Sequence, residues 1–272
     1  MALIAMVVYD TIDNGRTVLT KRTIDSLMQT VNFSRHRLVI SDNGSCEGTR
    51  DFFRFCVDFP FTLIENGGNI GTANAINRAW SLRERGEHCI KMDNDVVIHQ
   101  PEWADWIEDV FARESKIGIC GLKRKDLDER PWSKEWWYES RVYMLPQEKG
   151  QRWLVVEEVQ HVMGTCQGYS SAFLDKIGYL YQPGIYGFDD SLAAFRARVA
   201  GFKSVFLHGF EIDHIDPGGN EHTEWKRRHA GEHMAEYQRL RDGYRSGELN
   251  VYYDGGDMLR EWAGARSVTC PS

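Results

Sequence analysis

Residues 89–98 read CIKMDNDVVI. An apolar run that ends abruptly in acids and an amide is typical of a buried strand that meets solvent. Asp93 and Asp95, one residue apart at a bent strand end, can point into the same space. Hard oxygen ligands in this arrangement suit a divalent cation, which would also bind a diphosphate. A solvated turn after the strand explains the triplet equally well when it is considered alone.

Three earlier apolar runs end in the same way, and we expect strands there. They cover residues 3–9, 38–41 and 61–64, and helical spacing of apolar residues separates them. Repeated β-α-β units of this length imply an α/β fold, with a parallel sheet covered by helices on both faces. Ligands bind such sheets at the carboxyl ends of the strands. The sequence places polar side chains at those ends: Asp10, Asp42, Asn66 and the triplet at 93–95.

The second half of the chain is less regular. Its segment 123–153 carries Trp132, Trp136 and Trp137, which either pack a small core or stack on a sugar or a base. The patterns that follow predict a helix at 189–200, a strand at 204–208, a loop at 213–219 and one charged amphipathic helix at 222–245. With no repeat or low-complexity linker, we expect a single domain over residues 1–272.

Composition excludes several classes of protein. A net charge of -7 over 272 residues argues against a surface that attracts polyanions as a whole. The six cysteines form no CxxC pair and lie mostly in apolar runs, which indicates reduced core thiols. Residues 1–9 lack the basic region of a signal peptide, and no apolar run approaches the roughly 18 residues that span a bilayer. We therefore expect a soluble, cytoplasmic protein.

Two further polar groups suggest chemistry. Asp189 and Asp190 open the expected helix, where carboxylates cap free N–H groups. Two adjacent acids exceed what a cap needs, so one of them can act as a general base on a hydroxyl. His214 follows a strand and can bind a metal through neutral imidazole, although a solvated loop histidine is the simpler alternative.

In their order and spacing, these segments resemble the GT-A-fold glycosyltransferases, and within them the large family-2-type group. The segments are VISDNGS at 39–45, ENGGNIGTANAIN at 65–77, MDND at 92–95, and GFDD at 187–190 with Arg196 and AGF at 200–202. The resemblance extends over residues 1 to 216. It implies a GT-A (Rossmann-like) mixed, mainly parallel sheet, a nucleotide-sugar donor, and Mn²⁺ or Mg²⁺ as cofactor.

The resemblance also implies roles in binding the donor. Asp42 would contact the nucleotide base, and Tyr9 and Asp10 would lie near it. Asn66, Gly71 and Asn74 would lie along the nucleotide pocket. Residues 1–100 would form the nucleotide-sugar-binding half, 101–220 the acceptor and catalytic half, and 221–272 a C-terminal helix and tail.

The roles in metal binding and catalysis follow in the same way. Asp95 would ligate the metal, Asp93 would reach the metal or the ribose, and His214 would complete the metal site. Asp190 would be the catalytic base, with Asp189 as the alternate.

The expected reaction is transfer of a sugar from a nucleotide diphosphate-sugar to an acceptor hydroxyl. Among such donors we expect a UDP-sugar. If Asp190 is the base, the anomeric centre is inverted. The acceptor is a glycan, a small molecule or a hydroxymethylated DNA base. The locally basic segment 225–229 can contact donor phosphates or a nucleic-acid backbone, although a solvated helix face is the simpler alternative because glutamates are interleaved with it. Two alternatives stay open: a sugar-1-phosphate nucleotidyltransferase, and a non-catalytic nucleotide- or sugar-binding module, which would need no base.

Overall fold

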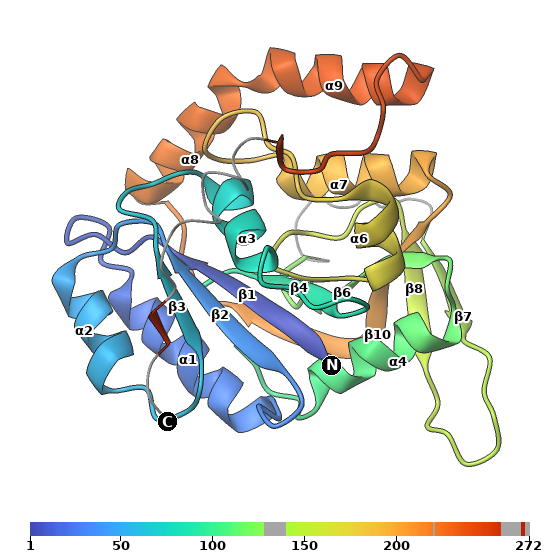
Figure 1. Cartoon of the computed structure of the whole chain (residues 1–272), viewed down its shortest axis with the longest axis horizontal. Coiled ribbons are helices and arrows are strands. Elements are labelled where there is room, and N and C mark those ends of the chain that lie inside the picture. The colour runs from blue at the N-terminus through green and yellow to red at the C-terminus, as the bar shows by residue number, and fades with distance from the viewer. Residues whose placement is uncertain (128–139, 220, 257–267, 270–272) are drawn as a thin grey trace.

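A computed structural model describes residues 1–127, 140–219, 221–256 and 268–269. Its sheet has the order β11-β3-β2-β1-β4-β9-β6-β10-β8-β7, with β5 paired to β10 (Figure 1). The strands are β1 Ala2–Val8, β2 Arg37–Asp42, β3 Thr62–Glu65, β4 His88–Met92, β5 Val96–Ile98, β6 Ile117–Arg124, β7 Arg141–Met144, β8 Val155–Val159, β9 Cys166–Tyr169, β10 Lys203–His214 and β11 Val268–Thr269. The helices are α1 Thr17–Thr30, α2 Glu47–Phe55, α3 Thr72–Trp80, α4 Trp103–Arg113, α6 Ser171–Ile177, α7 Asp189–Val199, α8 Glu221–Glu232 and α9 Met234–Ser246.

The sheet is parallel in its N-terminal part and mixed beyond it. Strands β3, β2, β1 and β4 pair in parallel, as their apolar runs predict. Antiparallel β9 then lies between β4 and β6, and β6 pairs in parallel with β10. The carboxyl ends of β1, β2, β3 and β4 therefore share one edge, which confirms the predicted mixed α/β fold.

Strand β1 is buried on both faces, which explains its continuous apolar sequence. Ile4 and Met6 pack in one core cluster with residues of α1, α2 and α4. Leu3 and Ala5 point the other way, into a second cluster with residues of α3, α6 and α7. Figure 1 shows these two groups of helices on opposite sides of the sheet. Helices on both faces are thus confirmed.

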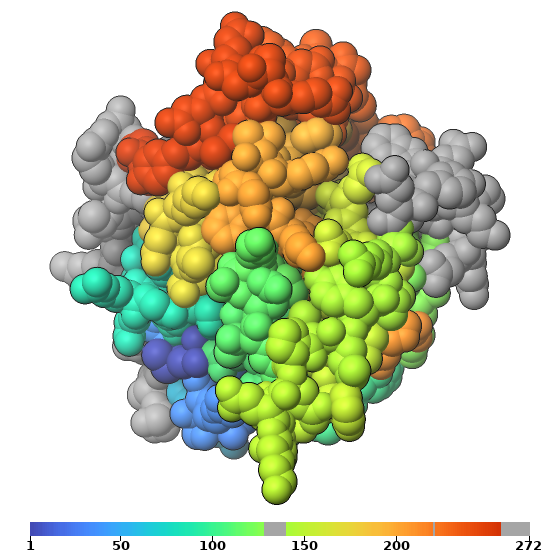
Figure 2. Space-filling view, turned by 90° about the vertical axis from the view of Figure 1, so that its right-hand side faces the viewer, coloured from blue at the N-terminus to red at the C-terminus, as the bar shows by residue number. Residues whose placement is uncertain are grey.

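The C-terminal part differs from the prediction. The single helix expected at 222–245 is two helices, α8 and α9, with a break at His233. Helix α9 buries Tyr237, Leu240 and Tyr244 in a cluster with Leu192 of α7. Figures 1 and 2 show α9 resting on α7. Helix α8 buries no residue. The break at His233 therefore separates a solvated helix, α8, from a helix that packs against α7, although the sequence pattern of the two is continuous.

Four other expectations can be compared with the structure. Asp213 and His214 belong to β10 and not to a loop, because this end of β10 pairs with β5. The segment with Trp132, Trp136 and Trp137 lies outside the described residues. Of the cysteines, Cys89, Cys120 and Cys166 are buried free thiols, Cys46 is half-buried and Cys56 is exposed. Among the helices that the structure describes, none has the length and apolar character that a bilayer crossing requires.

Arg196 is a fully buried cation that ties α7 to two other segments. Its guanidinium donates to the backbone carbonyls of Ile177, Tyr179 and Val251 at 2.6, 2.7 and 2.6 Å. Burial lowers the pKa of Arg196 to about 10, so it stays protonated at neutral pH. These three bonds hold the end of α6 and the C-terminal segment against α7, and so fix the helix that begins with Asp189.

We predict that Arg196→Ala lowers the free energy of unfolding by about 3 to 5 kcal/mol, because three buried carbonyls lose their donor. Urea denaturation measures this change. Arg198→Ala, on the exposed side of the same helix, is the control and should change it by less than about 0.5 kcal/mol. Equal losses in the two variants would contradict this role of Arg196.

Candidate active site

A cavity of about 280 Å³ opens at the carboxyl ends of β1 and β4, between the start of α7 and helix α8. Several predicted site residues that are far apart in sequence line it together. They are Tyr9, Asp93, Asp95, Asp189, Asp190 and His214. Asp93 and Asp95 thus lie at the sheet edge, as their position after a strand predicts. Helix α7 brings Asp189 and Asp190 to the same cavity, and β10 brings His214.

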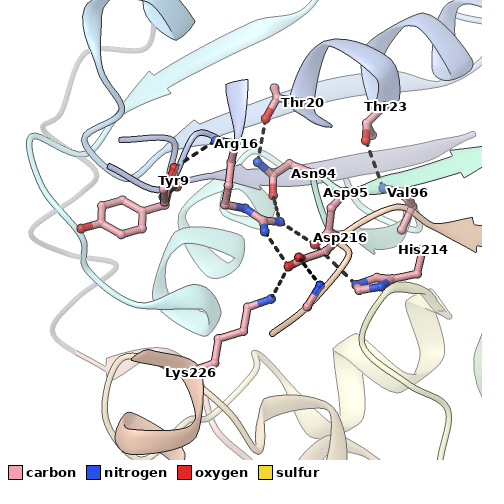
Figure 3. Close-up of polar contacts among 12 residues, drawn as sticks. Tyr9, Arg16, Thr20, Thr23, Asn94, Asp95, Val96, His214, Asp216 and Lys226 are labelled. Carbon is pink, nitrogen blue, oxygen red and sulfur yellow. Dashed lines mark hydrogen bonds and ion pairs between the residues drawn. The ribbon is translucent and has the colours of Figure 1, made fainter. Parts of the chain in front are cut away.

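Asp95 is the most enclosed carboxylate of this cavity. Its Oδ2 lies 2.5 Å from an Arg16 guanidinium nitrogen and 3.5 Å from His214 Nε2 (Figure 3). Its Oδ1 is buried and accepts no hydrogen bond from the residues that the structure describes. Burial alone would raise the pKa of Asp95, but His214, Arg16 and Lys226 outweigh it and hold the pKa well below its usual range. Asp95 is therefore an ionised carboxylate with one oxygen left for another ligand.

Arg16 and Lys226 bring positive charge to the same place from the two ends of the sequence. Arg16 donates to Asp216 Oδ2 at 2.7 Å, and Lys226 Nζ lies 3.4 Å from that oxygen (Figure 3). Burial raises the pKa of Asp216, but the Gly218 N–H, Arg16 and Lys226 together lower it to about 2. Asp216 thus holds two cations at the cavity, one from the start of α1 and one from α8.

Lys91 is the buried cation on the opposite side of the cavity. It forms an ion pair with Asp189 and also faces Asp93 and Asp190. Burial would lower the pKa of Lys91, but these three carboxylates raise it above its ordinary value. Burial raises the pKa of Asp93 to about 6, because the charge of Lys91 offsets desolvation only in part and Asp95 adds repulsion.

Asp190 faces the cavity beside Asp189 but has different partners. Its Oδ2 accepts the Gly164 N–H at 2.8 Å and lies 3.2 Å from His161 Nε2. Its Oδ1 accepts the Ser191 N–H at 2.7 Å. Burial raises the pKa of Asp190, but His161, Lys91 and the Ser191 N–H outweigh it and lower the pKa. Its side chain is 22% exposed, against 7% for Asp189, so Asp190 is the more accessible of the two.

Two of the acids predicted to contact the donor lie beneath the cavity and do not line it. Asp10 is fully buried; it accepts from Thr20 and Thr49 through Oδ2 and from Asn94 through Oδ1. Asp42 is buried and accepts the Ser45 N–H at 2.9 Å. Burial raises the pKa of both carboxyl groups. In this structure they brace the loops that follow β1 and β2.

Three residues predicted to line the nucleotide pocket, Asn66, Gly71 and Asn74, are likewise not among the residues that line the cavity. Asn66 donates to Asn43 and accepts from Arg78, and Asn74 donates to the Ile70 carbonyl. Gly71 begins α3 with φ 88°, and an added Cβ would lie 3.0 Å from the Ile185 backbone, so only glycine fits this close crossing. Asn66, Gly71 and Asn74 support the cavity wall, and their neighbours Asn43, Asn69 and Thr72 line it.

Sequence reasoning missed much of the positive and aromatic lining. Arg16 lies in a turn with no pattern of its own, and its partner Asp216 is 200 residues away. Lys91 carries one usable signal, a single charge within a buried strand, since such a charge needs a partner. Trp225 of α8 stands 6.2 Å from Tyr9 and 5.6 Å from Tyr186, measured between ring centroids. The residues that were missed are Arg16, Lys91, Arg124, Tyr186 and His222. Trp225 and Lys226 belong to the basic segment for which the sequence offers a contact with donor phosphates as one interpretation.

The donor set at Asp95 suits a divalent cation. The unpartnered Oδ1 of Asp95 and the imidazole of His214 would hold it, with Asp93 nearby in the same cavity. Among the described residues, the group of three whose ligand atoms all lie within 4.8 Å of one another is instead His36, Asp105 and Glu108. That group lies beyond the opposite end of β1, where the Met1 amine and Arg35 already form ion pairs with it.

Comparison with known proteins identifies the family of the chain. The family described as Glycosyl transferase family 2 matches residues 14–178, more than half of the chain. The chain belongs to glycosyl transferase family 2. No curated protein sequence gives a significant match.

Solved structures of glycosyltransferases share the fold of this family-2 chain. The mannosyltransferase PcManGT from Pyrobaculum calidifontis, in complex with GDP-Man and Mn²⁺, has a TM-score of 0.61 at 17% identity, over 88% of this chain and 64% of that one. Residues 1–349 of TarS from S. aureus give 0.62 at 15%, over 90% and 65%. GalNAc-T7 with UDP, GalNAc and Mn²⁺ gives 0.56 at 12%, over 97% and 57%. The family-2 chain thus spans less than two thirds of each of these chains.

We predict that Lys91→Met lowers the free energy of unfolding at pH 7 by about 3 to 5 kcal/mol, because Asp189 is left as a buried charge without its counter-ion. The loss should shrink towards pH 5. Lys91 lowers the pKa of Asp93, so without Lys91 this pKa lies further above the unfolded value of about 3.9, and the folded state takes up protons that the unfolded chain does not. Urea denaturation at the two pH values measures both effects.

The double variant Lys91→Met/Asp189→Asn is the matched control, and it should recover much of the loss at pH 7. If the double variant is no more stable than Lys91→Met, the loss comes from packing and not from an uncompensated charge.

Proposed function

We propose that this family-2 chain is a metal-dependent, inverting glycosyltransferase that moves a sugar from a nucleotide diphosphate-sugar, UDP-sugar first, to an acceptor hydroxyl. One observation carries the proposal. Asp95, with its unpartnered oxygen beside His214, and Asp190, with its accessible carboxylate, line the same cavity. A site for the leaving diphosphate and a base for the acceptor are the two parts that such a transfer requires.

The donor occupies the part of the cavity near Tyr9, Asn43 and Asn69. The aromatic ring of Tyr9 offers a surface for a nucleobase, and the amides offer donors and acceptors for base or ribose. Mn²⁺ or Mg²⁺, held by Asp95 and His214, supplies Lewis-acid stabilisation of the diphosphate when bound. GDP-Man is bound in the PcManGT structure, and UDP is bound in the GalNAc-T7 structure and in a further structure of TarS residues 1–349.

Arg16 and Lys226 are the protein's own cations for the diphosphate. In this structure both are held by Asp216, and Arg16 also by Asp95. A diphosphate offers these cations stronger, charge-assisted hydrogen bonds. On donor binding, Lys226 would bring α8 towards the phosphates and cover the cavity, which excludes water from the reacting sugar.

Asp190, and not Asp189, is the base in this proposal. Asp189 is paired with buried Lys91, which fixes its charge and position. Asp190 is accessible from the cavity, and an acceptor hydroxyl next to it would give up its proton as its oxygen attacks the anomeric carbon. Attack opposite the departing diphosphate inverts the configuration of that carbon.

The acceptor in the proposal is a glycan or a small molecule. The basic segment 225–229 gives no support for a DNA acceptor in the described part of the structure. Lys226 turns into the cavity, and Arg227 pairs with Glu224. Residues 1–100 supply the donor wall and residues 101–220 supply Asp189, Asp190 and His214, but Trp225 and Lys226 also line the cavity. The C-terminal segment 221–272 therefore takes part in donor binding.

We expect UDP or a UDP-sugar to raise the melting temperature of the protein in the presence of Mn²⁺ or Mg²⁺ and not in EDTA, because binding to the folded state stabilises it by mass action. Asp95→Ala should abolish the metal-dependent shift. Asp25→Ala, an exposed acid on α1, is the control and should keep it. A thermal-shift panel that includes GDP and GDP-mannose measures the effect and identifies the nucleotide.

The absence of a metal-dependent shift with every nucleotide would refute the proposed donor site. A shift that Asp95→Ala retains would place the metal elsewhere in the protein.

A further inference from the structure

The connection between β8 and β9 contributes one side chain that the proposed reaction does not yet use. His161 lies in this connection with its Nε2 3.2 Å from Asp190 Oδ2. His161 is not among the residues that line the cavity, whereas Asp190 is. His161 therefore contacts the catalytic carboxylate without facing the space that substrate would occupy.

The connection itself is closely packed and ties the two halves of the site together. Val162 is fully buried, and its carbonyl accepts a hydrogen bond from the Gln167 side chain. The Asp93 N–H donates to the Thr165 carbonyl at 3.0 Å. A Cβ added at Gly164 would lie 2.7 Å from Lys91 Nζ and 3.2 Å from Asp190 Oδ2. The same short segment thus fixes the backbone at Asp93 and reaches Asp190.

The hydrogen bonds of Asp190 leave one position open. An ionised carboxylate has about four lone-pair sites. The Gly164 N–H donates to Oδ2 and the Ser191 N–H donates to Oδ1. The second site on Oδ2 faces His161 Nε2 at 3.2 Å, a contact between charged groups without the alignment of a hydrogen bond. The remaining site is on Oδ1, where an acceptor hydroxyl could deliver its proton. With His161 removed, the Gly164 and Ser191 N–H groups still occupy one site on each oxygen, but the second site on Oδ2 loses its neighbour, which gives the carboxylate more freedom to turn.

We propose that His161 is a positioning residue, whose Nε2 stands 3.2 Å from Asp190 Oδ2 and restrains that oxygen, so that Oδ1 stays directed towards the acceptor hydroxyl. This inference rests on the proposed function, because it assigns to Asp190 the role of base. His161 contacts neither substrate nor metal, and its effect passes through the orientation of Asp190. A base held in one orientation keeps the reacting atoms in a productive geometry, and small misplacements of such a group slow the reaction strongly.

The test uses water as the acceptor, since donor hydrolysis needs the same base. We would measure release of UDP or GDP from UDP-glucose, UDP-N-acetylglucosamine and GDP-mannose with Mn²⁺, in the wild type and three variants. His161→Ala removes the contact with Asp190, and His161→Gln keeps an N–H at similar reach. His208→Ala, an exposed histidine on β10, is the control.

We expect His161→Ala to lower kcat at least about tenfold while KM for the donor changes less than about twofold, because donor binding does not involve His161. His161→Gln should restore a large part of kcat, and His208→Ala should match the wild type. The metal-dependent thermal shift with the nucleotide should be the same in all four proteins.

Two results would overturn the inference while leaving the proposed function intact. One is a kcat in His161→Ala equal to that of the wild type. The other is an equal loss in His161→Ala and His161→Gln together with lower melting temperatures, which would show a structural role only. If the wild type releases no nucleotide from any of the three donors, the proposed function fails and the inference falls with it.

Discussion

Four carboxylates line one cavity in this protein, a fifth pairs with two of the cavity's cations, and the folded state depends on how their charges are balanced. Lys91 faces Asp189, Asp190 and Asp93, and Arg16 and Lys226 stand against Asp95 and Asp216. Burial of this many acids without cations would raise their pKa values until they lost the charge that binding and catalysis need. The cations therefore keep the site ionised while it holds no donor. The acids are Asp93, Asp95, Asp189, Asp190 and Asp216.

The positive charge and hydrogen-bond donors are distributed unevenly among the aspartates. Their different surroundings suit Asp95, Asp189 and Asp190 to different roles. Asp189 is neutralised by a buried lysine and serves structure. Asp190 is held by N–H donors and faces the cavity, which suits a base. Asp95 keeps a buried, unpartnered oxygen, which suits a cation. Environment, more than residue type, distinguishes these three aspartates.

The sequence predicts the parts of the fold that local patterns encode. The strands β1, β2, β3 and β4 are continuous apolar runs because both faces of the sheet are covered, and they were readable for that reason. The edge strand β7 is largely exposed and β9 is short, so neither has a comparable pattern. The break between α8 and α9 depends on the packing of α9 against α7, which no local pattern shows.

The acids of the cavity were predictable because strand ends and helix starts mark them, and their partners were not. Arg16 meets Asp216 and Asp95 only through the fold, and Lys226 arrives from a helix whose sequence indicates a solvated surface. Asp10 and Asp42 illustrate the opposite case. Their place at strand ends is as predicted, but buried hydroxyl and amide partners hold them beneath the cavity.

The central claim is that Asp95 and His214 bind a divalent cation together with a nucleoside diphosphate. A crystal structure of the protein with UDP and Mn²⁺, with anomalous diffraction recorded for manganese, tests it most directly. We predict an anomalous peak bonded to Asp95 Oδ1 and His214 Nε2, with the diphosphate completing its coordination. A peak at His36, Asp105 and Glu108 instead, or UDP bound in the cavity with no manganese at Asp95, would contradict the claim.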